Sequence, residues 1–337
     1  MSAPLTHQAR PAGSGPRRLE VSLLGRWEVL LGLVLVALVI LGARLSPVFA
    51  TAQNFTNLTA SAMEVGIMAL PMTLIIIAGE IDLSVESTVG LSGAVLGWLW
   101  AAGVSLWIAV PAVLLLGAAG GLLNGLLVTR AGLPSLVVTL GTLALLRGLA
   151  SVVLGPRAIS TFPTEFTAFG FGTLPGTPLP WSLLVFALLG LVLGVLLHAT
   201  WLGRQVFAVG KNQSAARYAG VRVRRLKTVL FVLSGTVAAL AGVILTARLS
   251  SARADAGQGL TLAVVTAVLL GGVDIFGGSG TLLGVVLAVF ALAMLQNALR
   301  LADVSTQLQS IAVGLLLIGS VVVPNVVIRF RRGGGTR

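Results

Sequence analysis

Long apolar runs, separated by short polar segments, dominate the pattern of hydrophobic and polar positions along this chain. A bilayer core about 30 Å thick requires about 20 apolar residues in a helix that crosses it. The runs therefore predict an all-α, polytopic membrane protein with about ten transmembrane helices. The predicted spans cover residues 27–43, 58–79, 86–104, 106–129, 134–154, 182–199, 228–247, 257–273, 280–298 and 307–328.

The polar segments divide the chain into one membrane domain, residues 26–328, and two basic tails. The tail 1–25 is rich in Pro, Gly and Arg and is expected to be disordered, and residues 329–337 form a second basic tail. The Pro-rich segment 155–181 predicts an external loop, and residues 201–227 predict a long internal loop. A cleaved signal peptide is an alternative for the first run, which we interpret as a retained anchor because many spans follow it.

Composition and charge further restrict the class of protein to which this chain can belong. Hydrophobic residues make up 56% of the 337 positions and charged residues only 9%, whereas soluble domains carry about 25% charge. A net charge of +12 is typical of proteins that bind nucleic acid. In this chain, however, most of the basic residues are predicted to lie on one side of the membrane. With ten spans, 16 of the 22 basic residues fall on the side that holds both termini. The positive-inside rule therefore predicts that both termini are cytoplasmic.

The chain lacks the residues that several kinds of functional site require. The chain has no cysteine, which excludes disulfides and thiolate metal sites, and His7 and His198 cannot form a metal centre by themselves. No serine has a histidine base nearby, so an enzyme is not predicted. The phosphate-binding pattern G-x-x-x-x-G-K-[ST] is also missing. Any use of ATP must therefore come from a partner.

Small residues recur at helical spacing in three places. They are Gly117, Gly121 and Gly125; Gly190 and Gly194; and Gly280 and Gly284. Such spacing lets helix backbones approach closely in lipid, so we interpret these glycines as packing positions. In addition, residues 79–83 (GEIDL) resemble residues 271–275 (GGVDI). This echo is either an internal repeat with broken helices, as transporters often have, or a coincidence.

Polar residues within apolar runs are the candidates for the translocation path, because a charge at the centre of a span is costly. Glu64 faces the path or lies near the outer interface. Glu80 and Asp82 line the path or cap the helix that begins near Ser84. Arg147 is expected to pair with a carboxylate, and Asn124 to hydrogen-bond across helices. The hypothetical path set is Glu64, Glu80, Asp82, Asn124 and, from the echo, Asp274.

The internal loop 201–227 contains the signals of a short helix. Asn212 can cap its start, Gly220 can end it, and the segment between them offers an apolar face of Ala215, Ala216, Tyr218 and Ala219. A short helix with small side chains suits insertion into a groove on another protein. The alternative is that the basic residues of this loop only enforce topology and touch lipid headgroups.

Four segments together carry a resemblance to a known family. They read GEIDLS, GLPSLVVTLGTLALLRGLASVVLG, GRQVFAVGKNQSAARYAGVRV followed by Lys227, and VLLGGVDIFGGSGTLLGVV. In this order they resemble the permeases of bacterial sugar-importing ABC transporters of the ribose, xylose, rhamnose and autoinducer-2 group. Glu80 and Glu86 depart from the pattern, because many ribose-type relatives have glycine at these positions.

The resemblance implies a ten-helix permease in the bacterial cytoplasmic (inner) membrane. Its implied partners are a second permease copy or paralogue, a cytoplasmic ATPase that holds ATP and Mg²⁺, and a periplasmic or extracellular sugar-binding protein. No cofactor is expected on this chain. The implied ATPase-coupling residues are Lys211, Asn212, Gln213, Ala215, Ala216, Arg217, Tyr218 and Gly220.

A neutral, monosaccharide-sized solute is expected, because the spans contain no cluster of Arg or Lys that would attract an anion. GEIDLS, LLRGLASVVLG, FPTEFTAFG and LHATWLGRQVFAVG resemble rhamnose-type permeases most, so rhamnose is the preferred substrate. Ribose, xylose and autoinducer 2 remain alternatives. The alternative from another functional class is an ATP-independent channel or secondary transporter in which Glu64, Glu80 and Asp82 carry protons or ions.

Overall fold

The computed structural model describes the backbone of residues 23–333 and the side chains of residues 27–322. This part of the chain forms thirteen helices and no β-strand. In chain order they are α1 (Leu23–Leu45), α2 (Ala52–Ile77), α3 (Val85–Ala101), α4 (Leu106–Thr129), α5 (Ser135–Leu154), α6 (Thr164–Phe171), α7 (Trp181–Ala199), α8 (Trp201–Lys211), α9 (Gln213–Tyr218), α10 (Val223–Leu249), α11 (Leu260–Leu270), α12 (Leu282–Leu301) and α13 (Thr306–Gly333).

The two predicted tails fall largely outside this description. Residues 1–22 of the predicted tail 1–25 lie outside the described residues, and residues 23–25 already belong to α1. At the other end α13 continues to Gly333, so the first residues of the predicted tail 329–337 are helical. Residues 334–337 lie outside the described part.

Each of the ten predicted spans contains a helix, and the all-helical membrane fold is confirmed. Within the described residues, seven helices are long and apolar enough to cross a membrane: α1, α2, α4, α5, α7, α10 and α12. The predicted span 257–273 is wrong in length, because α11 has only 11 residues and measures about 16 Å. Gly259 and Gly272, with φ of 83° and 86°, adopt the left-handed backbone that ends a helix on either side.

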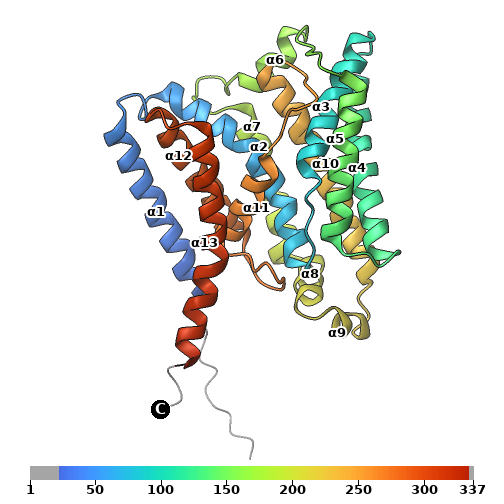
Figure 1. The fold of residues 1–337 in the computed structure, drawn as a ribbon, viewed down its shortest axis with the longest axis vertical. Helices are drawn as coiled ribbons and strands as arrows, with labels where there is room; N and C mark the ends of the chain where they lie inside the picture. Colours follow the sequence, from blue (N-terminus) through green and yellow to red (C-terminus); the bar gives the residue numbers. More distant parts are fainter. Residues whose placement is uncertain (1–22, 334–337) are drawn as a thin grey trace, which may run out of the picture.

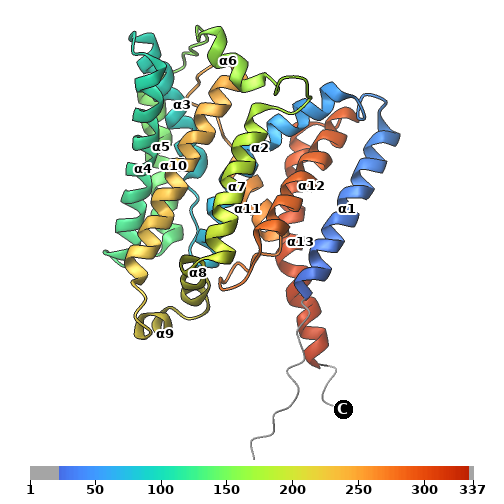
Figure 2. The same cartoon turned by 180° about the vertical axis from the view of Figure 1, so that it is seen from behind.

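The helices form two groups around a central layer (Figures 1 and 2). One group contains α3, α4, α5 and α10, and the other contains α1, α12 and α13. Between them lie α2, α7 and the half-length α11, and α2 is buried along most of its length. The first described turn of α1, the last turn of α13 and the short α9 all lie at one end of the molecule, whereas α6 lies at the opposite end (Figure 1).

The glycines on α4 make the close helix contact that their spacing predicts. A side chain at Gly121 would meet the backbone of Phe231 on α10, and one at Gly125 would lie 2.9 Å from Cα of Thr228. Gly117 faces Gly235 in the same way. The helix pair therefore packs backbone against backbone, as small residues permit in lipid.

The glycines of α7 make no such close contact with the other described helices. A side chain at Gly194 would meet nothing within 4 Å, and one at Gly190 would meet only Leu70 at 3.9 Å. This helix packs through other positions, because Phe186, Leu193 and Leu197 are its buried apolar residues. In the third pair, by contrast, Gly284 lies directly against the backbone of Gly271.

The two similar segments, residues 79–83 and 271–275, each follow the C-terminal end of a helix. The two helix ends have the same hydrogen-bond pattern. At the end of α2 the N–H of Gly79 donates to Ile76 O (2.9 Å) and that of Glu80 to Ile75 O (3.1 Å). At the end of α11 the N–H of Gly272 donates to Leu269 O (3.0 Å) and that of Val273 to Val268 O (3.3 Å). Both are Schellman caps on a left-handed glycine. Gly79 therefore matches Gly272, one position away from the sequence alignment with Gly271.

The positions of α6 and α9 at opposite ends give a first testable prediction about topology. A cysteine in place of Glu165, which is exposed on α6, should react with a membrane-impermeant thiol reagent added outside the cell. A cysteine in place of Arg217 on α9 should react only after permeabilisation, because the positive-inside rule predicts that the basic end faces the cytoplasm. The cysteine-free chain provides a clean background. External labelling at position 217 would contradict the orientation.

Candidate functional site

The helix predicted in the internal loop is present as α9, and its two local signals act as expected. The side chain of Asn212 accepts a hydrogen bond from the N–H of Ala215 (2.9 Å) and caps the helix start. Gly220, with φ of 86°, takes the left-handed conformation after the helix end. Thr200 caps the preceding α8 in the same manner through the N–H of Gly203. The two helices follow each other at the basic end of the molecule, with α8 beside the end of α2 and α9 farther from the helix layers (Figure 1).

Only part of α9 is available to another protein. Tyr218 is 93% exposed, and Ala215, Arg217, Ala219 and Gly220 are also exposed. Ala216 is 4% exposed and packs in the main hydrophobic core. A substitution at Ala216 therefore tests folding, and a test of docking has to use the exposed residues.

A short extended segment between α2 and α3, residues 78–84, forms the second part of the site and is here called the polar linker. Its backbone is held by α5, because the N–H of Ile81 donates to Ser135 Oγ (3.2 Å) and Thr139 Oγ1 donates to Ile81 O (3.3 Å). Non-helical backbone at membrane depth requires such protein partners, since lipid offers none. The polar linker is therefore fixed to the helices around it.

Glu80 on the polar linker is joined to the start of α9 through one lysine. Lys227 Nζ, in the first turns of α10, donates to Glu80 Oε1 (2.5 Å) and to Gln213 Oε1 (2.8 Å). The side chains of Lys227 and Glu80 are only 7% and 14% exposed. A buried ion pair tolerates little change in geometry, because either partner alone is an uncompensated charge. The ammonium group of Lys227 therefore connects the start of α9 with the polar linker.

Asp82 lies at the centre of a second, fully buried network. Its carboxylate accepts hydrogen bonds from Ser84 N (3.0 Å), Ser84 Oγ (2.6 Å) and Ser234 Oγ on α10 (2.8 Å). Asn124 on α4 donates through Nδ2 to Ser84 Oγ (2.9 Å), as its predicted role across helices requires. Asp82 thus holds the turn before α3 and also ties that turn to two other helices.

The other candidate path residues are separated from this network. Glu64 is buried on α2 and forms an ion pair with Arg248, at the far end of α10. Asp274 is exposed in the loop between α11 and α12, where its carboxylate accepts from the N–H of Phe276 (2.9 Å). That loop reaches α2, because Gly278 N donates to Ile77 O (2.8 Å).

Sequence reasoning missed the partners of these charges. Lys227 stood out only through the family resemblance, with no partner assigned to it, and Arg248 was not singled out. Both lie in a terminal turn of α10, and a cation inside the end of an apolar run is a signal that a buried carboxylate needs a partner. Arg147 does pair with a carboxylate as expected, and that partner is Glu86 at 3.6 Å.

The site is a set of ionic and hydrogen-bonded contacts that connect the polar linker with α4, α5, α9 and α10. Among residues 27–322 no group of three or more His, Asp or Glu gathers where it could hold a metal ion. The ionisable groups of the polar linker are each occupied by a hydrogen-bonding partner.

Comparison with known proteins gives the family. Residues 54–321 match the family described as "Branched-chain amino acid transport system / permease component". The chain is 40% identical over 299 residues to an autoinducer 2 import system permease protein LsrD of Klebsiella pneumoniae, which covers 87% of this chain and 89% of the relative. It is 41% identical over 266 residues to the protein of that name from Yersinia enterocolitica (77% and 80%), and 37% identical over 302 residues to that of Photorhabdus laumondii (88% and 90%). No solved structure matches the chain significantly.

The matched region contains all of α3 to α12, with α8 and α9 among them. It also contains the polar linker, which precedes α3. Relatives over this length are transport subunits and not enzymes, and the helices are long enough to cross the cytoplasmic membrane. The chain belongs to this permease family, and it is a permease subunit of an ABC importer of the sugar and autoinducer-2 group.

Proposed function

We propose that this chain, together with a second permease subunit, forms the path by which autoinducer 2 enters the cell. A separate cytoplasmic ATPase binds ATP and Mg²⁺, and an extracytoplasmic binding protein delivers the solute. The names of the relatives support autoinducer 2 over rhamnose, since each of the three is an autoinducer 2 import permease. Ribose, xylose and rhamnose are the alternative solutes.

The observation that carries the proposal is the chain of contacts from α9 to the polar linker. Gln213 belongs to α9, Lys227 to α10 and Glu80 to the polar linker, and the ammonium group of Lys227 bonds to both side chains. An importer driven by a separate ATPase needs this kind of connection between its cytoplasmic surface and its membrane interior. A secondary transporter, in contrast, has no need of a protruding helix linked to the interior in this way.

The mechanism that follows is alternating access. When the ATPase subunits close, α9 moves with them and α8 transmits the motion to the end of α2, where Gly210 packs against Ile77 and Gly278. The polar linker follows through Glu80 and changes the packing of α3, α4 and α10, which its hydrogen bonds connect. The two permeases then rock between outward-open and inward-open states.

The docking role predicts a result for the exposed face of α9. Ala219→Glu should weaken co-purification of the ATPase about 30-fold, because a charge at the centre of a docking interface removes the contact of a small side chain in a groove. Ala131→Glu is the matched control, since Ala131 is exposed in the turn between α4 and α5 at the same end of the molecule. Equal recovery of the ATPase with both variants would contradict docking through α9.

The solute is tested by uptake. The importer, reconstituted with its ATPase and its cognate binding protein, should take up labelled autoinducer 2 in an ATP-dependent manner. Ribose and rhamnose, supplied in the same way, should be taken up poorly. ATP-dependent uptake of rhamnose in preference to autoinducer 2 would overturn the choice of solute, and uptake without ATP would overturn the importer mechanism.

A further inference from the structure

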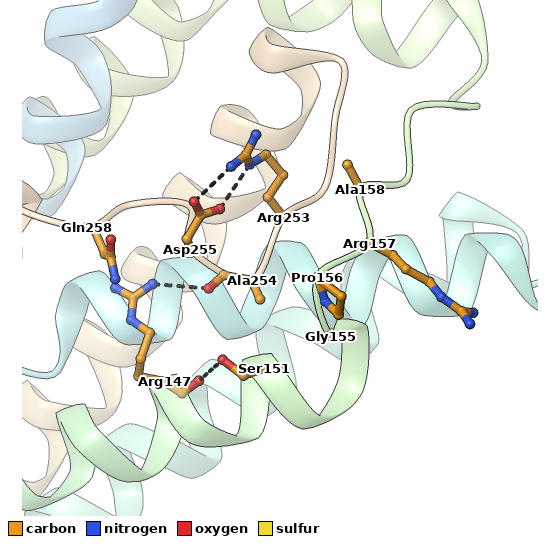
Figure 3. Close-up of a pocket in the computed structure, with 10 residues that line it drawn as sticks. All are labelled: Arg147, Ser151, Gly155, Pro156, Arg157, Ala158, Arg253, Ala254, Asp255 and Gln258. Atoms are coloured by element: carbon orange, nitrogen blue, oxygen red, sulfur yellow. Dashed lines mark hydrogen bonds and ion pairs between the residues drawn. The ribbon is translucent and has the colours of Figure 1, made fainter.

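A pocket of about 410 Å³ opens at the end of the molecule opposite α9. It is separate from α9 and the polar linker, which together are called the coupling site below. It lies between the last turns of α5, the loop that follows α5, and the segment that leads from α10 down to α11 (Figure 3). Its lining residues are Arg147, Ser151, Gly155, Pro156, Arg157, Ala158, Arg253, Ala254, Asp255 and Gln258. Arg147 lies seven residues before the end of α5, so the pocket reaches about 10 Å along this helix.

The walls of the pocket are fixed by main-chain and side-chain bonds. Ile159 and Ala252 exchange two backbone hydrogen bonds, of 3.1 and 2.8 Å, and join the loop after α5 to the descending segment. Arg147 Nη1 donates to the carbonyl oxygens of Ala254 (3.1 Å) and Ala256 (3.3 Å). The pocket is therefore a formed feature of the fold, as small-molecule sites generally are.

Two of the three arginines that line the pocket are paired with a carboxylate. Arg253 donates two hydrogen bonds of 2.9 Å to the carboxylate of Asp255, and these side chains are 57% and 54% exposed. These bonds hold the pKa of Asp255 below its usual range, so the pair stays charged at physiological pH. Arg147 is compensated by Glu86 at 3.6 Å. Arg157 points away from the other polar side chains (Figure 3). The cavity thus offers donors and acceptors side by side, and the two ion pairs leave only the outward-pointing Arg157 in excess.

An exposed ion pair beside an apolar helix face cannot lie against lipid without a large penalty. Val152 and Leu149 on the neighbouring surface of α5 are exposed and apolar, whereas the pocket itself is lined with polar groups. The pocket therefore opens to water, in the position where a solute would arrive from outside.

Resting on the proposed import function, we propose that this pocket is the external entry site of the permease and binds a neutral solute with neighbouring hydroxyl groups. The guanidinium of Arg253 donates to one hydroxyl oxygen, the carboxylate of Asp255 accepts from the next, and Gln258 can do either. A volume of about 410 Å³ suits a solute of monosaccharide size, at the lower end of small-molecule pockets. A free phosphate or carboxylate would find Arg147 and Arg253 already paired with Glu86 and Asp255.

The entry site also connects to the coupling site. Glu86, the partner of Arg147, lies in the first turn of α3 directly after the polar linker, and its carboxylate accepts from the N–H groups of Gly259 (3.0 Å) and Thr261 (3.2 Å) at the start of α11. A solute that shifts Arg147 would therefore act on the same segment that Glu80 ties to α9.

The experiment uses cysteine protection in the assembled importer, in membranes without the binding protein. Gln258→Cys, inside the pocket, and Arg157→Cys, at its rim, are labelled from outside with an impermeant thiol reagent. Autoinducer 2, ribose and inorganic phosphate are each added over a concentration series. We expect autoinducer 2 or ribose to slow labelling at position 258 and leave position 157 unchanged. Asp255→Asn should raise the concentration needed for half protection about tenfold or more.

Protection and uptake are separate readouts, so the two proposals can fail separately. Loss of autoinducer 2 uptake with protection by ribose would retain the entry site and change the solute. Normal uptake without protection at position 258, or protection that Asp255→Asn leaves unchanged, would overturn the entry site. Protection by phosphate but not by the neutral solutes would overturn the proposed ligand class. Failure of external reagent to label position 157 would show that the pocket does not face outside.

Discussion

Lys227→Met should reduce ATP-driven uptake by the assembled importer at least about tenfold and lower the free energy of unfolding by about 3–5 kcal/mol. The substitution leaves Glu80 as an uncompensated charge in a site where its side chain is only 14% exposed. It also leaves the side-chain oxygen of Gln213 without its donor. Vesicle uptake measures the loss of transport, and thermal unfolding of the purified permease, followed by tryptophan fluorescence, measures the loss of stability.

The matched control is the double variant Lys227→Met with Glu80→Gln. It removes the uncompensated charge, so most of the lost stability should return. Uptake should not return, because the ionic connection from α9 to the polar linker is still missing. If the double variant recovers both stability and uptake, the pair has only a structural role. Wild-type uptake by Lys227→Met alone would contradict the connection altogether.

Gly121→Ala and Gly120→Ala should have opposite effects, although they are neighbours on the same helix. A Cβ at Gly121 would fall on the backbone of Phe231 and lie 2.9 Å from Cα of Val232 on α10. The backbone of α10 cannot yield as a flexible side chain can, so we expect a loss of about 3 kcal/mol and poor accumulation in the membrane. A Cβ at Gly120 would meet only Leu146 Cδ1, at 3.9 Å. That substitution should be neutral, or stabilising by up to about 1 kcal/mol, through helix propensity.

Membrane fractionation and thermal unfolding of the two variants provide the measurement. The comparison cancels the general effect of replacing a glycine in α4, because both changes add the same methyl group. Similar stability of the two variants would mean that α4 and α10 are farther apart than the structure has them.

The local features of this chain follow from its sequence because short-range rules determine them. Apolar runs of about 20 residues identify the spans, since a bilayer leaves few alternatives to a helix. Asn212 and Gly220 define α9 in advance, because a cap depends on residues three or four positions away. The family resemblance also comes from the sequence alone.

The hydropathy pattern predicts some other local features incorrectly, because it does not specify where a helix begins and ends. The run 257–273 is predominantly apolar, yet its helix occupies only Leu260–Leu270, because glycines with left-handed backbone stand on both sides. Hydropathy measures polarity and does not register backbone conformation. The same limit explains why the echo between residues 79–83 and 271–275 was aligned one position away from the shared helix cap.

The pairing of charges was decided only by the tertiary structure. Glu80 and Lys227 are 147 residues apart, and Arg248 and Glu64 are 184 apart. No spacing rule links such positions, because their distance depends on how α2, α3 and α10 pack. The sequence therefore determined that buried carboxylates were present and costly, and the packing of the helices determined which cation compensates each of them. The entry pocket has the same origin, since Arg147 and Arg253 line one pocket only because the segment after α10 descends along α5.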